Sequence, residues 1–328
     1  MTPIKRIFCL MVAGLFAPPL LALDTSRPDV RAFIDEMVSR NGMDGTELNA
    51  LFRGVESKQA ILDAISRPAE RTIPWFEYRE RFLTQQRIQK GVAFWKQHQE
   101  RLDSISAAGL PAQIAVGILG VETSFGEITG RYRVIDALST LAFDYPPRSP
   151  YFRGELEQFL MLIREEDVNP RTAIGSYAGA MGAPQFMPTS YRKWAVDGDA
   201  DGRRDLWASW DDVIGSIANY LKDHGWRTGE PVSVPATLDN PDLSQFSTGI
   251  ELKETIQSLK TKGVVFEIDL PADSPAVLIA AQGKNGPEYR VGFNNFYVIT
   301  RYNRSPLYAM AVYDLGQAIA GQVKDAGR

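Results

Sequence analysis

The chain has 328 residues, of which 44% are hydrophobic and 23% are charged, and its formal net charge is −4. This length is sufficient for a substantial buried core and predicts about two domains, with room for a small additional one. The negative charge argues against a nucleic-acid partner, because such sites neutralise phosphates with clustered lysine and arginine.

The N-terminus has the pattern of a secretory signal peptide, which we expect to span residues 1–23. Lys5 and Arg6 precede an apolar stretch, and polar residues begin at Asp24. This pattern predicts export to the periplasm and cleavage. The residues around Ala22 fit a cleavage site only loosely, so an uncleaved membrane anchor is the alternative.

Cysteine chemistry is excluded from the mature chain. The single cysteine, Cys9, lies inside the apolar N-terminal stretch, a position that does not suit a lipoprotein. A core of this size needs no disulfide, so export to an oxidising compartment is compatible with a chain that lacks cysteine.

The order of the expected elements predicts a mainly α fold of the α+β class. Apolar residues at helical spacing, as in residues 30–39 and 89–98, predict a helical N-terminal region over residues 24–110. Residues 111–229 should form a central region that carries the chemistry. Its expected helices lie near residues 114–126, 134–142 and 154–164.

The C-terminal part has a different pattern. Residues 230–300 contain short β-rich stretches, such as 231–238 and 276–281, around a helix near 252–261. They predict a small α/β subdomain. Residues 301–328 return to a helical pattern and should pack back on the helical core.

Glu122 is the single carboxylate in the apolar run of residues 114–126. A run that is apolar on every side predicts a buried helix, and burial favours the protonated form of a carboxylic acid. If the helix ends between Thr123 and Gly126, the negative end of its dipole raises the pKa further. A raised pKa suits a general acid, and the alternative is a helix-end glutamate bound by backbone groups or arginine.

An acidic loop begins at Asp197. Asp197, Asp199 and Asp201 stand at positions 1, 3 and 5, Gly202 stands at position 6, and Arg203 could offer its carbonyl at position 7. This is the first half of an EF-hand calcium loop. The alternative is an acidic surface turn.

The second half of the loop departs from the EF-hand pattern. Ala208 stands at position 12, where a bidentate glutamate is expected. A longer loop closed by Asp211 or Asp212 could still complete a site for a hard cation, with Asp205 as a further ligand.

Residues 175–191 are rich in glycine and alanine, with Gln185 as the polar group of interest. Small residues allow the backbone to approach a neighbour closely, and a long ligand is one explanation. The alternative is close packing of two helices, followed by a helix that is capped by Thr189 or Ser190.

Tyrosines with polar neighbours recur at Tyr78, Tyr145, Tyr220, Tyr302 and Tyr308. A tyrosine offers a flat apolar face and a hydroxyl, which suits a sugar ring, although core packing is the alternative for each. The two histidines, His98 and His224, have no neighbours in the sequence that would indicate a hydrolase triad or a zinc site.

Four segments in this order resemble the lytic murein transglycosylase B family: VETSFG at 121–126, GAMGAPQFMP at 179–188, the loop at 197–212 and ITRYNRS at 299–305. The resemblance extends over about residues 28–322. It implies a lysozyme-like helical catalytic core, a helical N-terminal region, an EF-hand-like calcium loop and a small β-containing subdomain. The implied substrate is peptidoglycan.

By this resemblance Glu122 performs both proton transfers. It protonates the glycosidic oxygen between N-acetylmuramic acid and N-acetylglucosamine, and then deprotonates the C6 hydroxyl of the muramoyl sugar. A 1,6-anhydro ring closes, and the N-acetyl group stabilises the cationic intermediate. No convincing second carboxylate stands near the motif, whereas ordinary glycosidases use a pair.

The resemblance also implies the remaining site residues. The implied glycan-groove residues are Tyr78, Thr123, Arg148, Gln185, Tyr220, Tyr302, Asn303 and Tyr308. The implied calcium ligands are Asp197, Asp199, Asp201, Arg203 and Asp212, with calcium in a structural role. Where related members often have two adjacent arginines this chain has Pro147 before Arg148, so one cationic contact is missing.

Two other functions stay open at the level of the sequence. A muramidase would admit water instead of closing the ring, and a calcium-stabilised peptidoglycan-binding protein would not turn over its ligand. The expected partner is the glycan strand. The sequence leaves open any partner among cell-wall synthases and hydrolases, and whether cleavage is endo or exo.

Overall fold

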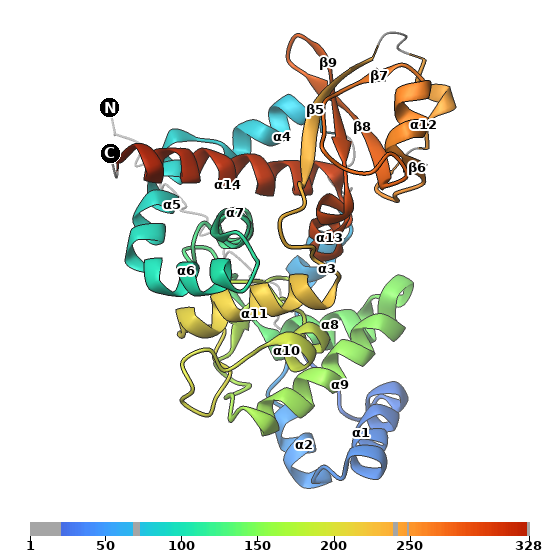
Figure 1. Cartoon of the computed structure of the whole chain (residues 1–328). Coiled ribbons are helices and arrows are strands. Elements are labelled where there is room, and N and C mark those ends of the chain that lie inside the picture. The colour runs from blue at the N-terminus through green and yellow to red at the C-terminus, as the bar shows by residue number, and fades with distance from the viewer. Residues whose placement is uncertain (1–20, 68–72, 239–241, 248, 327–328) are drawn as a thin grey trace, which may run out of the picture. The chain divides into compact units, whose positions relative to one another are not determined.

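The computed structural model describes residues 21–67, 73–238, 242–247 and 249–326 (Figure 1). The predicted signal peptide lies outside these residues except at its last positions, 21–23. Internal contacts divide the chain into two units, residues 1–58 and residues 59–328. The helical region expected over residues 24–110 is thereby divided between them.

From residue 21 onward, the first unit contains two helices and a short antiparallel pair of strands. These elements are β1 (Leu21–Ala22), α1 (Pro28–Asn41), α2 (Gly45–Phe52) and β2 (Glu56–Ser57). The carboxylate of Asp44 accepts hydrogen bonds from the N–H groups of Thr46 and Glu47, and so caps α2. Phe33 and Phe52 pack edge to face in the small core of this unit.

The second unit is built mainly of helices. Its N-terminal helices are α3 (Gln59–Ile65), α4 (Trp75–Phe82), α5 (Gln85–Gln97), α6 (Gln99–Ala107) and α7 (Ala112–Thr123). Next come β3 (Tyr132–Arg133), α8 (Val134–Asp144), a 3₁₀ turn (Pro146–Arg148), α9 (Ser149–Glu165), β4 (Ile174–Gly175), α10 (Pro188–Trp194) and α11 (Trp210–Asp223). The helices predicted near 114–126, 134–142 and 154–164 are confirmed.

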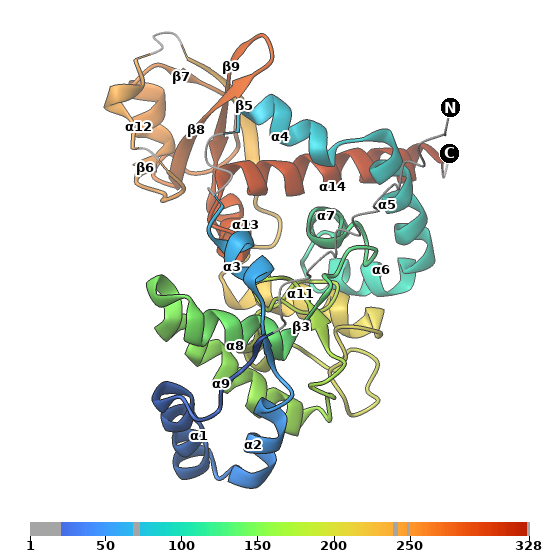
Figure 2. The same cartoon turned by 180° about the vertical axis from the view of Figure 1, so that it is seen from behind.

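A small antiparallel sheet follows, in the order β6-β8-β9-β5-β7. Its elements are β5 (Ser233–Leu238), a 3₁₀ turn (Leu243–Gln245), β6 (Glu254–Thr255), α12 (Ile256–Thr261), β7 (Val264–Val265), β8 (Pro275–Gly283) and β9 (Gly286–Gly292). Figure 2 shows α12 on one side of this sheet and α4 with α14 on the other. Residues including Phe246, Leu259 and Val291 form its own apolar core. The predicted mainly helical fold with a small β-containing part is confirmed.

The chain ends in α13 (Asn294–Tyr302) and α14 (Pro306–Ala326), and α14 packs on α7 as predicted. Glycine makes this contact close: a Cβ at Gly117 would lie 2.2 Å from the carbonyl oxygen of Val312, and one at Gly316 would lie 2.1 Å from that of Gln113. The helix that carries Glu122 is therefore held directly against the C-terminal helix. In the described part of the chain, no helix has both the length and the apolar character of a membrane span.

Candidate active site

Glu122 lies in the last turn of α7, whose other residues are almost all buried. The helix stops because Ser124 and Phe125 adopt left-handed backbone angles, with φ of 52° and 62°. This end confirms the predicted stop between Thr123 and Gly126. The half-buried carboxylate of Glu122 therefore stands where the apolar helix meets a turn.

Tyr308, near the start of α14, donates a hydrogen bond from its hydroxyl to Oε1 of Glu122 at 2.7 Å. The side chain of Tyr308 is only 2% exposed. Burial raises the pKa of Tyr308 well above its usual value, and the nearby charge of Glu122 raises it further. The hydroxyl therefore stays protonated at neutral pH and remains a donor.

Three other predicted tyrosines join the same cluster. The ring of Tyr302 lies 6.4 Å from that of Tyr308 and 4.9 Å from that of Tyr220, measured between centroids. Burial, followed by the charge of Glu122, also raises the pKa of Tyr302. Tyr78 is buried on α4 and contributes more weakly to the raised pKa of Tyr308. The side of the site formed by α4, α11, α13 and α14 is thus aromatic.

The glycine-rich segment reaches this cluster through three hydrogen bonds. The hydroxyl of Thr123 donates to the carbonyl of Ala183 at 2.9 Å, and that of Tyr302 donates to the carbonyl of Pro184 at 2.7 Å. Gln185 donates from Nε2 to the carbonyl of Thr129 at 3.0 Å, in the loop that follows Glu122. Thr123 is only 1% exposed, so its position suits orienting the segment.

The alternative reading of the glycine-rich segment is wrong in both parts. Residues 175–187 form turns and isolated bridges, from Gly175 to Met181 and from Met181 to Phe186, and not a helix. The next helix, α10, begins at Pro188, and its cap residue Met187 offers no side-chain hydrogen bond. Thr189 lies inside the helix because Pro188 is suited to the first helical position.

Two predicted groove residues are exposed and lie in other surroundings. The guanidinium of Arg148 stacks on Tyr151 and Phe152, at 4.4 and 5.1 Å from the ring centroids. Asn303 is exposed directly after α13.

Glu155 is a buried carboxylate that the sequence analysis missed. Its side chain is on α9, and its residue is 6% exposed. Its Oε2 accepts a hydrogen bond from the N–H of Thr189 at 2.9 Å, and burial raises its pKa. The sequence does carry an indication, because Glu155 stands among Phe152, Leu156 and Phe159 on the apolar side of α9.

The acidic loop brings three of the predicted ligands together. Single carboxylate oxygens of Asp197, Asp199 and Asp212 all lie within 4.8 Å of one another. Asp212 is 1% exposed and accepts hydrogen bonds from the N–H groups of Gly198 at 2.7 Å and Asp205 at 2.6 Å. Carboxylate oxygens retain further lone pairs, so this donor set fits a hard cation that would offset the mutual repulsion.

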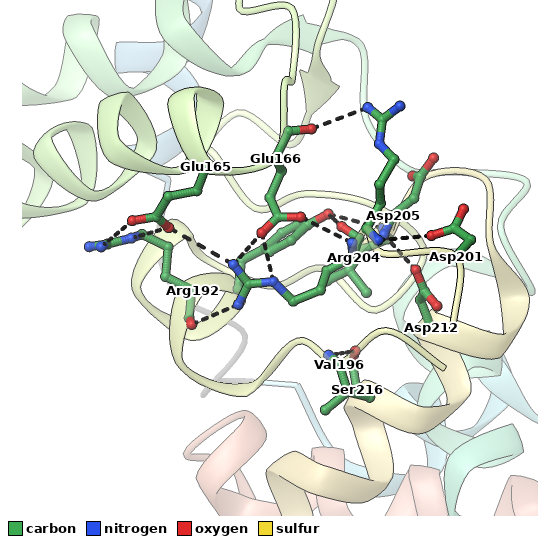
Figure 3. A network of polar contacts seen from close by, with 12 residues as sticks. Glu165, Glu166, Arg192, Val196, Asp201, Arg204, Asp205, Asp212 and Ser216 are labelled. Carbon is green, nitrogen blue, oxygen red and sulfur yellow. Dashed lines mark hydrogen bonds and ion pairs between the residues drawn. The ribbon is translucent and has the colours of Figure 1, made fainter. Parts of the chain in front are cut away.

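The other acidic residues of the loop have different partners. Asp201 accepts a hydrogen bond from the N–H of Arg203 at 2.8 Å, and Asp211 lies 3.9 Å from Nε of Arg101. Within the loop, Arg204 pairs with Glu166 (Figure 3). This ion pair attaches the loop to the end of α9.

Comparison with known proteins agrees with this geometry. The model of the transglycosylase SLT domain matches residues 25–317. The membrane-bound lytic murein transglycosylase B of Escherichia coli K12 is 41% identical over 305 residues, which cover 90% of this chain and 83% of that protein.

Two solved structures are similar over nearly their whole length. The soluble lytic transglycosylase SltB1 of Pseudomonas aeruginosa is 50% identical with a TM-score of 0.87, covering 92% of this chain and 100% of that one. The E. coli lytic transglycosylase Slt35, solved in complex with calcium, is 41% identical with a TM-score of 0.84, covering 90% and 94%. The chain therefore belongs to the lytic murein transglycosylase B family, and its helical core is the lysozyme-like core of that family.

Proposed function

We propose that Glu122 is the single acid and base with which this lytic transglycosylase cleaves the β-1,4 bond between N-acetylmuramic acid and N-acetylglucosamine. The observation that carries the proposal is the hydrogen bond from Tyr308 to Glu122 at the end of a buried helix. It orients the carboxylate at the point where the apolar helix meets a turn. Glu127, the next carboxylate along the chain, is paired with Lys90.

The two proton transfers balance on this one residue. Protonated Glu122 gives its proton to the glycosidic oxygen, the bond from that oxygen to C1 of the muramoyl sugar breaks, and N-acetylglucosamine leaves as an alcohol. The Glu122 carboxylate then takes the proton of the C6 hydroxyl, whose oxygen bonds to C1. The 1,6-anhydro product forms without water, and Glu122 is protonated again.

The groove residues have different roles in this proposal. Tyr302, which is half-buried, offers a flat face for a sugar ring near Glu122, whereas Tyr78 and Tyr220 are buried and support the aromatic side of the site from within. Gln185 lies on the same side of the site, where it donates a hydrogen bond to the carbonyl of Thr129 in the loop after Glu122. Arg148 and Asn303, both exposed, reach more distant parts of the glycan or its peptide stem, and buried Thr123 orients the segment that carries Gln185.

Mass spectrometry of the products tests the reaction and the residue together. The unmodified chain should release anhydromuramoyl products from purified peptidoglycan, and Glu122→Gln should reduce their rate of formation about 100- to 10,000-fold. Glu127→Gln is the matched control, because it removes a nearby carboxylate that is paired outside the cluster, and it should retain activity.

Each other outcome has a distinct meaning. Products heavier by one water would indicate a muramidase, and absence of products from the unmodified chain would favour a binding protein. Equal rates for Glu122→Gln and the unmodified chain would assign the acid to another residue.

We also infer that the acidic loop holds a structural calcium ion, with Asp197, Asp199 and Asp212 as carboxylate ligands and with Asp201 and Arg203 completing the predicted set. The carboxylate cluster supports this proposal, as does the calcium complex of Slt35. Calcium would stabilise the loop that leads into α11. The proposed place of action is the periplasm, to which the predicted signal peptide would export the chain.

Calcium should raise the melting temperature, and a chelator should lower it. At about 100 times the dissociation constant, a bound ion contributes about 2.7 kcal/mol to the free energy of unfolding. Asp199→Asn should reduce the calcium-dependent rise, whereas Asp211→Asn, whose carboxylate is near Arg101, should retain it. A melting temperature that does not respond to either treatment, with no metal by elemental analysis, would refute the site.

A further inference from the structure

A cavity of about 770 Å³ lies between the small sheet and α14. Its walls include Pro235 and Thr237 from β5, Glu288 and Arg290 from β9, and Tyr313 and Gln317 from α14. None of these residues belongs to the candidate active site.

The pairing register explains which sheet face forms the cavity. Pro235 is opposite Arg290, and Ala236 is opposite Tyr289. Because side chains alternate between the two faces, Pro235, Thr237, Glu288 and Arg290 share one face. Val234, Ala236 and Tyr289 pack against the apolar core beside α12, and of these Ala236 and Tyr289 also border the cavity. The cavity therefore uses the face directed toward α4 and α14 (Figure 2).

The helix separates this cavity from the active site. Gln317 follows Tyr308 by nine positions, and at about 100° per residue this is half a turn around the helix axis. The side chain of Tyr308 is directed toward Glu122, and the buried residues of α14 face α7. Tyr313 is half-buried and Gln317 is exposed, and both lie on the other side of α14.

One ion pair and a hydrogen bond from Trp75 hold the lining side chains of Arg290, Asp314 and Glu288. Arg290 pairs with Asp314 through two hydrogen bonds of 2.6 and 2.7 Å, and its guanidinium lies 5.7 Å from the centroid of Trp75. The indole N–H of Trp75 donates to Glu288 at 3.1 Å. Among the described residues that line the cavity, the one cation is thus already paired with a carboxylate.

We propose that this cavity is a second glycan-binding site, which takes uncharged N-acetylhexosamine units of the same polymer that the active site cleaves. The ring of Tyr313 and the face of Pro235 offer apolar surface for a sugar ring. Thr237, Gln317 and Glu288 offer hydrogen bonds to hydroxyl and amide groups. Because Arg290 is already paired, an anionic peptide stem would lack a free cation here.

The identity of the polymer in this inference rests on the proposed function. The cavity adds a second place at which the protein binds that polymer. Two sites on one strand raise the effective concentration of the strand at each. The second site therefore increases binding and cleavage of long strands, whereas a fragment that fills only the active site does not depend on it.

Retention on immobilised, peptide-free glycan strands tests the site. In the full chain carrying Glu122→Gln, Tyr313→Ala and Gln317→Ala should each weaken retention about three- to tenfold. Tyr313→Phe keeps the ring and should remain close to the parent. Leu243→Ala is the control, because it removes an exposed apolar side chain of the 3₁₀ turn Leu243–Gln245 that does not line the cavity.

Kinetics of the variants with Glu122 intact give a second readout. Tyr313→Ala should reduce cleavage of long strands and leave cleavage of a soluble tetrasaccharide unchanged. Unchanged retention by both the Tyr313 and Gln317 variants would overturn the inference, as would losses confined to strands that carry peptide stems. If the unmodified chain released no product, the proposed function would fail, while the retention measurement would still decide the second site.

Discussion

The hydrogen bond between Tyr308 and Glu122 determines how the proposed acid is presented. The two residues are 186 positions apart in the chain and 2.7 Å apart at their oxygen atoms. Because burial keeps Tyr308 protonated, its hydroxyl donates to Glu122 at every pH of interest. A donated hydrogen bond stabilises the charged form of a carboxylic acid. This effect opposes that of the apolar helix, which favours the protonated form.

Tyr308→Phe should lower kcat/KM about 10- to 100-fold, since a hydrogen bond to a charged group is lost. It should also move the alkaline limb of the pH profile to higher pH. The first step needs protonated Glu122, and removal of a donor that favours the carboxylate raises the pKa that governs this limb. Initial rates of anhydromuramoyl formation across the pH range measure both effects.

Tyr302→Phe is the matched control for this prediction. Its hydroxyl donates to the carbonyl of Pro184, so its removal should leave the position of the alkaline limb unchanged. A limb that moved equally in both variants, or moved to lower pH in Tyr308→Phe, would contradict the assigned role of Tyr308.

Glu155 connects two helices at the scale of elements. It projects from α9 and accepts the hydrogen bond of Thr189 at the start of α10. Met187 offers no side-chain cap to α10, so a carboxylate from another helix takes that place. Burial raises the pKa of Glu155 above its ordinary value of 4.5.

Glu155→Gln should change how stability depends on pH. The folded chain holds the Glu155 proton more tightly than the unfolded chain, so ionisation of Glu155 reduces the free energy of unfolding as pH rises above its ordinary pKa of 4.5. The stability of the unmodified chain relative to Glu155→Gln should therefore fall as pH rises above 4.5. Denaturant unfolding at several pH values measures this difference.

Glu157→Gln serves as the control, because Glu157 is half-exposed on the same helix and loses less hydration on folding. The difference in the free energy of unfolding between Glu157→Gln and the unmodified chain should vary less over the same pH range. An increase in the relative stability of the unmodified chain with pH would show that hydrogen bonds to the Glu155 carboxylate outweigh its burial.

At the scale of the whole second unit, Arg290 and Asp314 connect the small sheet to α14. Their side chains are only 18% and 16% exposed. Arg290 also stacks near Trp75 of α4, so three parts of the fold meet at this ion pair. The pair therefore helps to place the helix that carries Tyr308.

A double-mutant cycle should detect this connection in the free energy of unfolding. Arg290→Met and Asp314→Leu should each cost about 3 kcal/mol, because each leaves a mostly buried charge without its closest partner. The double variant should cost less than the sum of the two. The exposed pair Lys193 and Asp223 is the control, with an expected coupling below about 1 kcal/mol. Strict additivity at Arg290 and Asp314 would contradict the prediction.

Local patterns predicted the elements better than their boundaries and contacts. The apolar run around Glu122 predicted a buried helix with its correct end, because burial on all sides leaves a pattern in the sequence itself. The helix expected near 252–261 begins only at Ile256, where Thr255 caps it. The C-terminal helical segment is interrupted between Tyr302 and Pro306, where proline starts a new helix.

The sequence by itself determined the mainly helical fold with a small sheet, the acid at the end of a buried helix and the acidic loop, because these follow from composition, periodicity and spacing over short stretches. Only the tertiary structure decided which groups meet. It placed Tyr308 against Glu122, Glu155 against Thr189, and Asp212, in preference to Asp211, beside Asp197 and Asp199. Contacts between distant segments depend on how helices pack and on the rotation of each about its axis, and no local pattern specifies either.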